Sequence, residues 1–190
     1  NPQPLTTGSA QRINGEGALL RPVKGMKDEP PRIELVPIEK PGDANIIIGQ
    51  THFIKSTEDL YEAMVNSVPG VRFGVAFCEA SGPRLIRIEG NDDELRKCAT
   101  ENAKKVGAGH AFFVVMRNAF PVNVLPRIRD VAEVCTVFCA TANDVEVMVA
   151  ESSRGRGIIG VIDGQPPLGV ETDSDAKERK EFLRKIGYKR

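Results

Sequence analysis

Arginine and glycine alternate over residues 154–157, and this composition suits the binding of an anion. Residues 155–160 form a literal GxGxxG motif, which in dinucleotide-binding folds opens a helix after a strand. Here the motif runs into IIGVID, an apolar and β-branched stretch that predicts a strand, so a Rossmann-type site is disfavoured. Backbone N–H groups of this turn, together with Arg154 or Arg156, could hold a phosphate. The alternative is an ordinary hairpin turn with exposed arginines.

A second polar segment, Arg117–Pro121, directly follows the apolar run AFFVVM. A cation, an amide and an aromatic ring at the end of a buried strand suit ligand recognition. Arg117 could hold a phosphate, Asn118 could read a purine edge, and Phe120 could stack on the base. The alternative is a structural loop in which Phe120 belongs to the core. We expect this segment and the 154–157 turn to form one small-molecule site.

Candidates for proton transfer lie beside other predicted strands. Glu79 ends an apolar strand, and a carboxylate there could act as a general base or hold Mg²⁺ near a phosphate. His110, in the segment GAGH, is a possible proton shuttle, and His52 follows a buried strand. For both histidines the alternative is a structural, hydrogen-bonded role. Asn143 lies between two further strands.

Several familiar sites are missing from the sequence. It contains no GxxxxGK[ST] P-loop, no protein-kinase catalytic loop and no GxSxG nucleophile elbow. Any kinase activity would therefore need a different phosphate-handling scaffold. The four cysteines form no CxxC pair and are expected to be buried, inert thiols in a reducing compartment: Cys78, Cys98, Cys135 and Cys139. No metal site of the protein's own is predicted.

Composition limits the partners of the chain. The 190 residues fit one domain with a substantial core. The 26 basic and 26 acidic residues cancel, and there is no Trp, so neither nucleic acid nor an anionic membrane is an expected partner. No apolar run approaches the ~18 residues of a membrane span. We expect a cytoplasmic protein.

Apolar periodicity places these segments on a set of strands and helices. Strands are predicted over residues 32–38, 44–50, 71–80, 85–89, 111–116, 135–140, 145–151 and 158–163. Helices are predicted from residue 56, from residue 91 to 107, after residue 121 and over residues 174–186. We expect an α/β fold, with a mixed α+β arrangement as the alternative: a mixed β-sheet core of about eight strands, with about four packed helices, in a single compact domain.

Local signals predict how these elements end. Ser56 and Asp59 have the spacing of a capping box, and Pro69–Gly70 is expected to terminate that helix. Asn91 is expected to cap the next helix, which stops at Gly107. Pro37 cannot donate to a ladder, so the first strand is expected at a sheet edge.

The two ends of the chain receive separate predictions. Residues 1–31 lack helical or strand periodicity and are interpreted as an added or disordered leader, with an arm that docks on a neighbouring subunit as the alternative. The domain is expected over residues 32–190. In the C-terminal helix, Asp175–Arg179 and Glu181–Lys185 are expected to pair at i,i+4. Its basic face is interpreted as solvated, and a partner surface is the alternative.

Seven segments together resemble the adenosine-specific kinase family, a former domain of unknown function found largely in archaea and thermophilic bacteria. They are IELVPIEKP (33–41), GQTHFIKSTEDLYEAMVNSVPG (49–70), FGVAFCEASGPRL (73–85), GAGHAFFVVMRNAFPVNVL (107–125), VFCATANDVEVMVAES (137–152), GRGIIGVIDG (155–164) and EFLRKIGYK (181–189). The resemblance covers residues 32–190. It implies an α/β subunit that binds adenosine or AMP and assembles as a homo-oligomer, with a trimer favoured.

Carried onto this chain, the resemblance implies ligand contacts at His52, Glu79, His110, Arg117, Asn118, Phe120, Asn143, Arg154, Gly155, Arg156 and Gly157. The leading hypothesis is transfer of phosphate from ATP, with Mg²⁺, to the 5′-hydroxyl of adenosine. Glu79 or His110 would then take the hydroxyl proton. The alternatives are a non-enzymatic nucleotide-binding or sensing module, and a hydrolase of small nucleotides.

Overall fold

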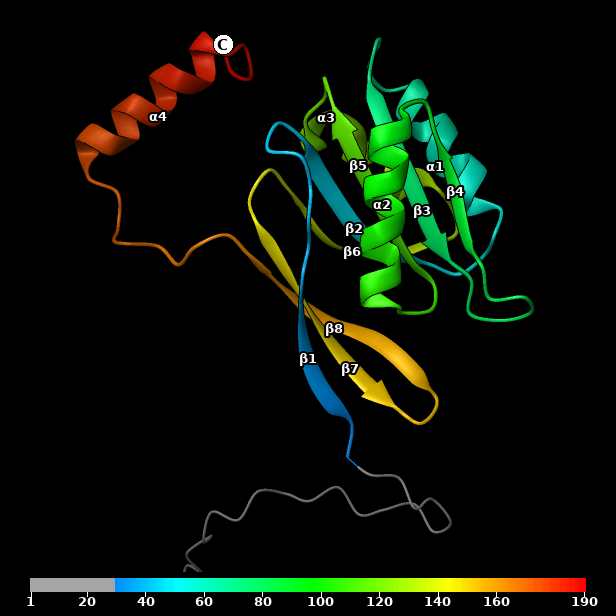
Figure 1. The fold of residues 1–190 in the computed structure, drawn as a ribbon. Coiled ribbons are helices and arrows are strands. Elements are labelled where there is room, and N and C mark those ends of the chain that lie inside the picture. The colour runs from blue at the N-terminus through cyan, green and yellow to red at the C-terminus, as the bar shows by residue number, and fades with distance from the viewer. Residues whose placement is uncertain (1–29) are drawn as a thin grey trace, which may run out of the picture.

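The computed structural model describes residues 30–190, which form eight strands and four helices (Figure 1). The strands are β1 Arg32–Pro37, β2 Asn45–Thr51, β3 Arg72–Cys78, β4 Ile86–Gly90, β5 Ala111–Arg117, β6 Val134–Thr141, β7 Val145–Ser152 and β8 Gly155–Asp163. The helices are α1 Ser56–Val65, α2 Asp93–Val106, α3 Pro121–Asp130 and α4 Asp173–Lys185. The leader expected over residues 1–31 lies outside the described residues except for its last two positions.

The strands form two antiparallel sheets, in the orders β4-β3-β5-β2-β6 and β1-β7-β8. The α/β class and the numbers of strands and helices are confirmed. The prediction of one mixed sheet is wrong, because every strand pair in residues 30–190 is antiparallel and the strands divide into two sheets. Two of these pairs, β3–β4 and β7–β8, join strands that follow each other in the chain, and so short a connection permits only antiparallel pairing. As Pro37 predicts, β1 lies at a sheet edge.

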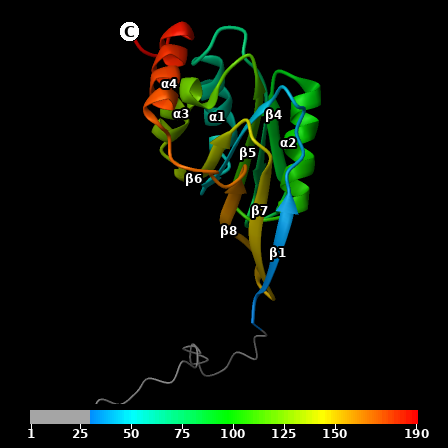
Figure 2. The same ribbon diagram turned by 90° about the vertical axis from the view of Figure 1, so that its left-hand side faces the viewer.

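Helices and the small sheet cover the two faces of the five-stranded sheet. Helices α1 and α3 lie on one face, and α2 lies on the other (Figure 2). Side chains alternate along β5, so Phe112 and Val114 join the core under α1 and α3, while Phe113 and Val115 join the core under α2. The inner face of the β1-β7-β8 sheet completes that second core. Strand β5 is thus buried on both faces.

The start of α1 differs from its prediction. The Ser56 hydroxyl donates to the Phe53 carbonyl, and Asp59 pairs with Lys55 instead of returning to the helix end, so no capping box forms. The helix ends at Val65, before the expected Pro69–Gly70 stop. Lys55 competes for Asp59 because the two side chains are four residues apart on one helix face.

The start of α2 is capped by a neighbouring residue. Asp92, and not Asn91, is the N-cap, and its carboxylate accepts the Leu95 N–H at 3.1 Å. Asn91 instead accepts the Phe73 N–H and donates to the Val71 carbonyl, so it ties the end of β4 to β3. The other end of α2 is as predicted, with Gly107 in the left-handed conformation at φ +60°.

The four cysteines are free thiols with different exposures. Cys78 and Cys139 are buried, and burial raises their pKa to about 11 and about 12 respectively. Cys98 is half-buried. Cys135 is exposed, contrary to expectation, because β6 is the edge strand of its sheet and nothing among residues 30–190 covers that part of it.

The C-terminal residues leave the two sheets. After β8, an extended segment leads to α4, which stands clear of both sheets (Figure 1). Arg179 pairs with Glu171, and the Asp175 carboxylate accepts the Thr172 N–H at 2.7 Å, so the expected Asp175–Arg179 pair does not form. The expected Glu181–Lys185 pair is also replaced, because Glu181 pairs with Lys177. No helix in residues 30–190 combines the length and apolar character needed to cross a membrane.

Candidate functional site

A cleft of about 770 Å³ lies where the ends of β3 and α2 meet the β7–β8 turn. It is lined by Cys78, Glu79, Ala80, Pro83, Arg84, Leu85, Ile86, Ala103, Lys104, Gly107, Gly109, Arg154, Gly155 and Arg156. The β7–β8 turn joins two antiparallel strands, so the non-Rossmann interpretation of its glycines is confirmed. Gly155 has φ +145°, a conformation that favours glycine.

Basic side chains predominate in the lining of the cleft. Among the described residues its lining carries four basic side chains against the single carboxylate of Glu79, and these are Arg84, Lys104, Arg154 and Arg156. A cleft lined by charges of one sign raises the local concentration of oppositely charged ligands. The expected ligand is therefore an anion, and the volume lies within the range of about 300–1,000 Å³ usual for small-molecule sites.

Glu79 holds the β3–β4 hairpin across the mouth of this cleft. Its carboxylate accepts the Leu85 N–H at 2.8 Å and the Arg87 Nε–H at 2.8 Å, and Arg87 Nη2 lies 2.6 Å away. The Leu85 hydrogen bond, with Arg87 adding to it, lowers the pKa of Glu79 below its ordinary value. Glu79 is thus ionised at neutral pH.

Arg156 is held at the cleft by acidic neighbours. Its Nη2 donates to Glu34 at 3.0 Å, and its Nη1 lies 3.8 Å from Glu151. Its buried Nε–H has no hydrogen-bond partner among residues 30–190. In the same turn, the Arg154 N–H donates to the Ser152 hydroxyl at 3.2 Å. Contacts within the chain therefore hold the turn at the edge of the cleft.

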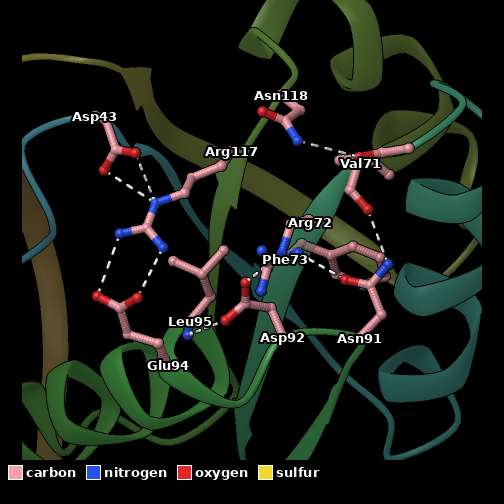
Figure 3. Close-up of polar contacts among 11 residues, drawn as sticks. Asp43, Val71, Arg72, Phe73, Asn91, Asp92, Glu94, Leu95, Arg117 and Asn118 are labelled. Atoms are coloured by element: carbon pink, nitrogen blue, oxygen red, sulfur yellow. Dashed lines mark hydrogen bonds and ion pairs between the residues drawn. The ribbon is translucent and has the colours of Figure 1, made fainter.

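Arg117 lies at the other end of β5 from this cleft. Its guanidinium donates to Glu94 at 2.8 and 3.2 Å and to Asp43 at 2.9 Å (Figure 3). These two carboxylates, Glu94 first, raise the pKa of Arg117 above its ordinary value. Beside it, Asn118 adopts φ +60° and its amide lies 3.4 Å from the Gly70 carbonyl. The arrangement joins β5, α2 and the β1–β2 loop.

The expectation that Arg117–Asn118 and the 154–157 turn form one site is wrong within a single chain. Gly109, just before β5, lines the cleft, whereas Arg117 is the last residue of that strand. At about 3.4 Å per residue, these two ends of β5 are roughly 20 Å apart. Phe120 follows at the Arg117 end and is 60% exposed, so it does not belong to the core.

Three other candidates also lie away from the cleft lining. The His110 ring stacks on Phe77 at a centroid distance of 6.1 Å, on the sheet face that α1 and α3 cover. His110 has φ +64°, which is unusual for a residue with a Cβ. His52 Nδ1 lies 3.0 Å from the Glu133 carbonyl. Asn143 lies in the β6–β7 turn and donates to Asp163 at 3.0 Å.

Two cationic residues of the cleft, Lys104 and Arg84, give no clear functional signal in the sequence. Lys104 occupies the last turn of α2, where a lysine is also expected simply to favour the helix dipole. Arg84 follows Gly82–Pro83 in a hairpin turn and has φ +56°, which the sequence did not indicate. No group of three or more His, Cys, Asp or Glu side chains in residues 30–190 is placed to hold a metal ion.

Comparison with known proteins identifies the family. The profile described as adenosine specific kinase matches residues 36–189. The crystal structure of the PH1918 protein from Pyrococcus horikoshii OT3 is similar, with 46% sequence identity and a TM-score of 0.81 over 84% of this chain and 99% of that chain. No curated protein matches the sequence. The chain belongs to the adenosine-specific kinase family.

Proposed function

We propose that the basic cleft binds adenosine and AMP, and that the protein transfers a phosphoryl group from ATP to adenosine. The family description supports the adenosine part of this proposal. One structural observation carries the choice of site: four cations surround a cleft of nucleotide size. Such a charge distribution favours a phosphorylated ligand over a neutral one.

The cleft residues have separate roles in this proposal. The phosphate groups lie against Arg154 and Arg156, and glycines 155 and 157 leave open space beside these side chains for the phosphate to approach. The base lies against Leu85 and Ile86, on the apolar side of the lining. Asn118 and Phe120, at the far end of β5, would reach a nucleotide only from a neighbouring subunit.

The proposed chemistry needs positioning more than covalent catalysis. The adenosine 5′-oxygen attacks the γ-phosphorus of ATP, the bond from that phosphorus to the ADP oxygen breaks, and the hydroxyl proton passes to Glu79. The remaining cations neutralise the charge that spreads over the transferred group. Mg²⁺ brought in with ATP would be held mainly by the phosphates and water, as is usual for this ion.

His110 is the second candidate for the residue that accepts the hydroxyl proton. Its ring lies on the sheet face opposite the cleft, so a role as proton acceptor would need a site formed with His52 at that face. Replacing Glu79 by Gln and His110 by Gly separates the two possibilities. Loss of kcat in E79Q alone, with AMP affinity unchanged, assigns the proton to Glu79, and the same loss in H110G alone assigns it to His110.

The test is direct. The full chain is incubated with adenosine, Mg²⁺ and ATP labelled in its γ-phosphate, and labelled AMP is separated from ATP and phosphate. We expect labelled AMP in proportion to protein and time. Labelled AMP no higher than in a heat-killed sample removes the phosphotransferase proposal, and labelled phosphate alone indicates a nucleotide hydrolase instead.

A non-enzymatic nucleotide-binding module is the second candidate. The missing P-loop favours it, as does the lowered pKa of Glu79, because a weakly basic carboxylate accepts protons poorly. AMP binding without product, with a ligand-dependent change in assembly, would identify this function. If neither adenosine nor AMP at millimolar concentration raises the melting temperature, both candidates lose their basis.

The family resemblance also supports proposals on assembly and location. We propose a homo-oligomer, with a trimer as the favoured state, in the cytoplasm of an archaeal cell. Sedimentation equilibrium of the full chain measures the first of these. A mass equal to the single-chain 20.7 kDa at all concentrations would contradict it.

A further inference from the structure

The C-terminal arm, defined as residues 164–190, carries apolar side chains that the rest of residues 30–190 leaves largely or partly exposed. They are Leu168, Val170, Phe182, Ile186 and Tyr188, with exposed fractions from 43% to 105%. No residue of α4 is buried, and the helix stands apart from both sheets (Figure 1). The arm therefore lacks a packing surface within the described chain.

An exposed helix with an apolar side is expected to pack that side against another surface. Helix α4 has 13 residues, and isolated helices of about 12–15 residues are marginal in water because most helix stability in proteins comes from packing of an apolar face. Phe182 and Ile186 are four residues apart, so they lie on one side of the helix. Its opposite side is strongly charged. The amphipathic pattern predicts that one side is covered.

A matching surface exists elsewhere in the same chain. The inner face of the β1-β7-β8 sheet is buried against α2 through residues such as Val36 and Val147. The alternate residues lie on the opposite face of the sheet, where most of the apolar side chains are exposed. They form the outer sheet face, which consists of Ile33, Leu35, Met148, Ala150, Ile159 and Ile162. Four of these side chains are 43–55% exposed: Ile33, Leu35, Ile159 and Ile162.

We propose that the C-terminal arm of one copy packs on the outer sheet face of a second copy. Each chain presents one arm and one such face, so a head-to-tail contact between copies can close into a ring that leaves neither uncovered. The family profile extends through the arm to residue 189, so the arm is part of the family's domain. Docking of an arm on its own chain would not need a second copy, and the experiment below separates the two.

The distribution of charge also favours packing of the arm on the outer sheet face. Arg184 and Lys185 make the last turn of α4 basic. At one end of the β1-β7-β8 sheet, exposed carboxylates gather in and after the β6–β7 turn and at the end of β8, namely Asp144, Glu146 and Asp163. A basic helix end and an acidic sheet end attract each other and help to fix the direction of docking.

The outer sheet face adjoins the basic cleft. A hollow of about 410 Å³ is lined by Ala150 and Ile159 and by residues 154–157, and three of these turn residues also line the cleft. An arm from a second copy would thus lie beside the proposed phosphate-binding turn. The docking proposal extends the homo-oligomer proposed above and does not depend on which nucleotide binds.

Charged substitutions on each surface test the proposal. In the full chain, F182E/I186E disrupts the arm, and L35E disrupts the outer sheet face. The matched controls are K180E, on the other side of α4, and V65E, an exposed apolar residue of α1. All of these side chains are exposed or partly exposed in the single chain, and circular dichroism checks that each variant is folded. Mass is measured by sedimentation equilibrium.

We expect the full chain and both controls to form an assembly of one fixed mass, and both disrupted variants to be monomers of about 20.7 kDa. Mixing F182E/I186E with L35E should restore a 1:1 pair, because one variant keeps an intact face and the other an intact arm. A monomeric full chain overturns the proposal. So does an F182E/I186E or L35E variant that keeps the mass of the full chain, or a mixture that stays monomeric.

Discussion

Arg117, the last residue of β5, holds Glu94 in the first turn of α2 through two hydrogen bonds of 2.8 and 3.2 Å. The same guanidinium binds Asp43 in the loop between β1 and β2 (Figure 3). A single side chain therefore joins three segments that are distant in the sequence. These ion pairs give Arg117 a structural role at the end of the most buried strand, and that role requires no ligand.

The Arg117–Glu94 pair makes stability depend on pH. Arg117 lowers the pKa of Glu94 below the usual 4.5, so the pair stabilises the folded state at neutral pH and this contribution is lost as pH falls below about 4.5 through the folded pKa. We expect Glu94→Gln to lower the melting temperature slightly at pH 7 and by less at pH 3. The effect should shrink at high salt, because the pair is exposed.

Glu58→Gln is the matched control for that measurement. Glu58 lies in the first turn of α1, as Glu94 lies in that of α2, but it makes no ion pair within residues 30–190. Its substitution should change little between pH 3 and pH 7. A Glu94→Gln effect that is the same at both pH values would show that the lost contact is not ionic.

Gly74 lies where β3 and α2 come closest. A Cβ at this position would lie 2.2 Å from the Arg96 nitrogen and 2.3 Å from the Leu95 carbonyl carbon, and neither backbone atom can move alone. We expect Gly74→Ala to destabilise the fold by about 1–3 kcal/mol or more, measured by urea unfolding. Gly42→Ala, with nothing within 4 Å of its Cβ, should be close to neutral. Equal effects would contradict this packing.

Lys104 offers a test of the cleft with a control on the same helix. Lys104 lines the cleft, whereas Lys97 lies two turns earlier on the same side of α2 and outside it. We expect Lys104→Met to weaken AMP binding about tenfold, as loss of one charged contact does, and to affect adenosine much less. Lys97→Met should leave both unchanged in calorimetric titrations. A similar loss for adenosine and AMP would place the phosphate elsewhere.

Thiol reactivity should follow burial. The raised pKa values of Cys78 and Cys139, about 11 and about 12, leave almost no thiolate at pH 8, whereas Cys135 is exposed. We expect one fast reaction with an aromatic disulfide reagent at pH 8, at Cys135. Peptide mass spectrometry identifies the modified residue. Persistence of the fast phase in Cys135→Ser would contradict this assignment.

Much of the fold could be predicted because its signals are local. Alternation and apolar runs located every strand, and the left-handed stop at Gly107 needed only a glycine at a helix end. Helix starts were less certain, because several residues compete for the same N–H groups. Asp92 and Asn91 are both good caps, and only the position of Phe73 on β3 decides which one is free to cap α2.

The sequence by itself determined the elements, the non-Rossmann turn at residues 154–157 and the membership of the family. Only the tertiary structure decided which polar segments meet. Antiparallel pairing sets the end of β5 beside the beginnings of β2 and β3, with Arg117 opposite Arg72. Arg117 therefore lies away from the cleft, which Glu79, Lys104 and Arg156 line together. The direction of a strand decides at which end of the sheet its last residue lies. Hydrogen-bond pairing with the neighbouring strands sets that direction.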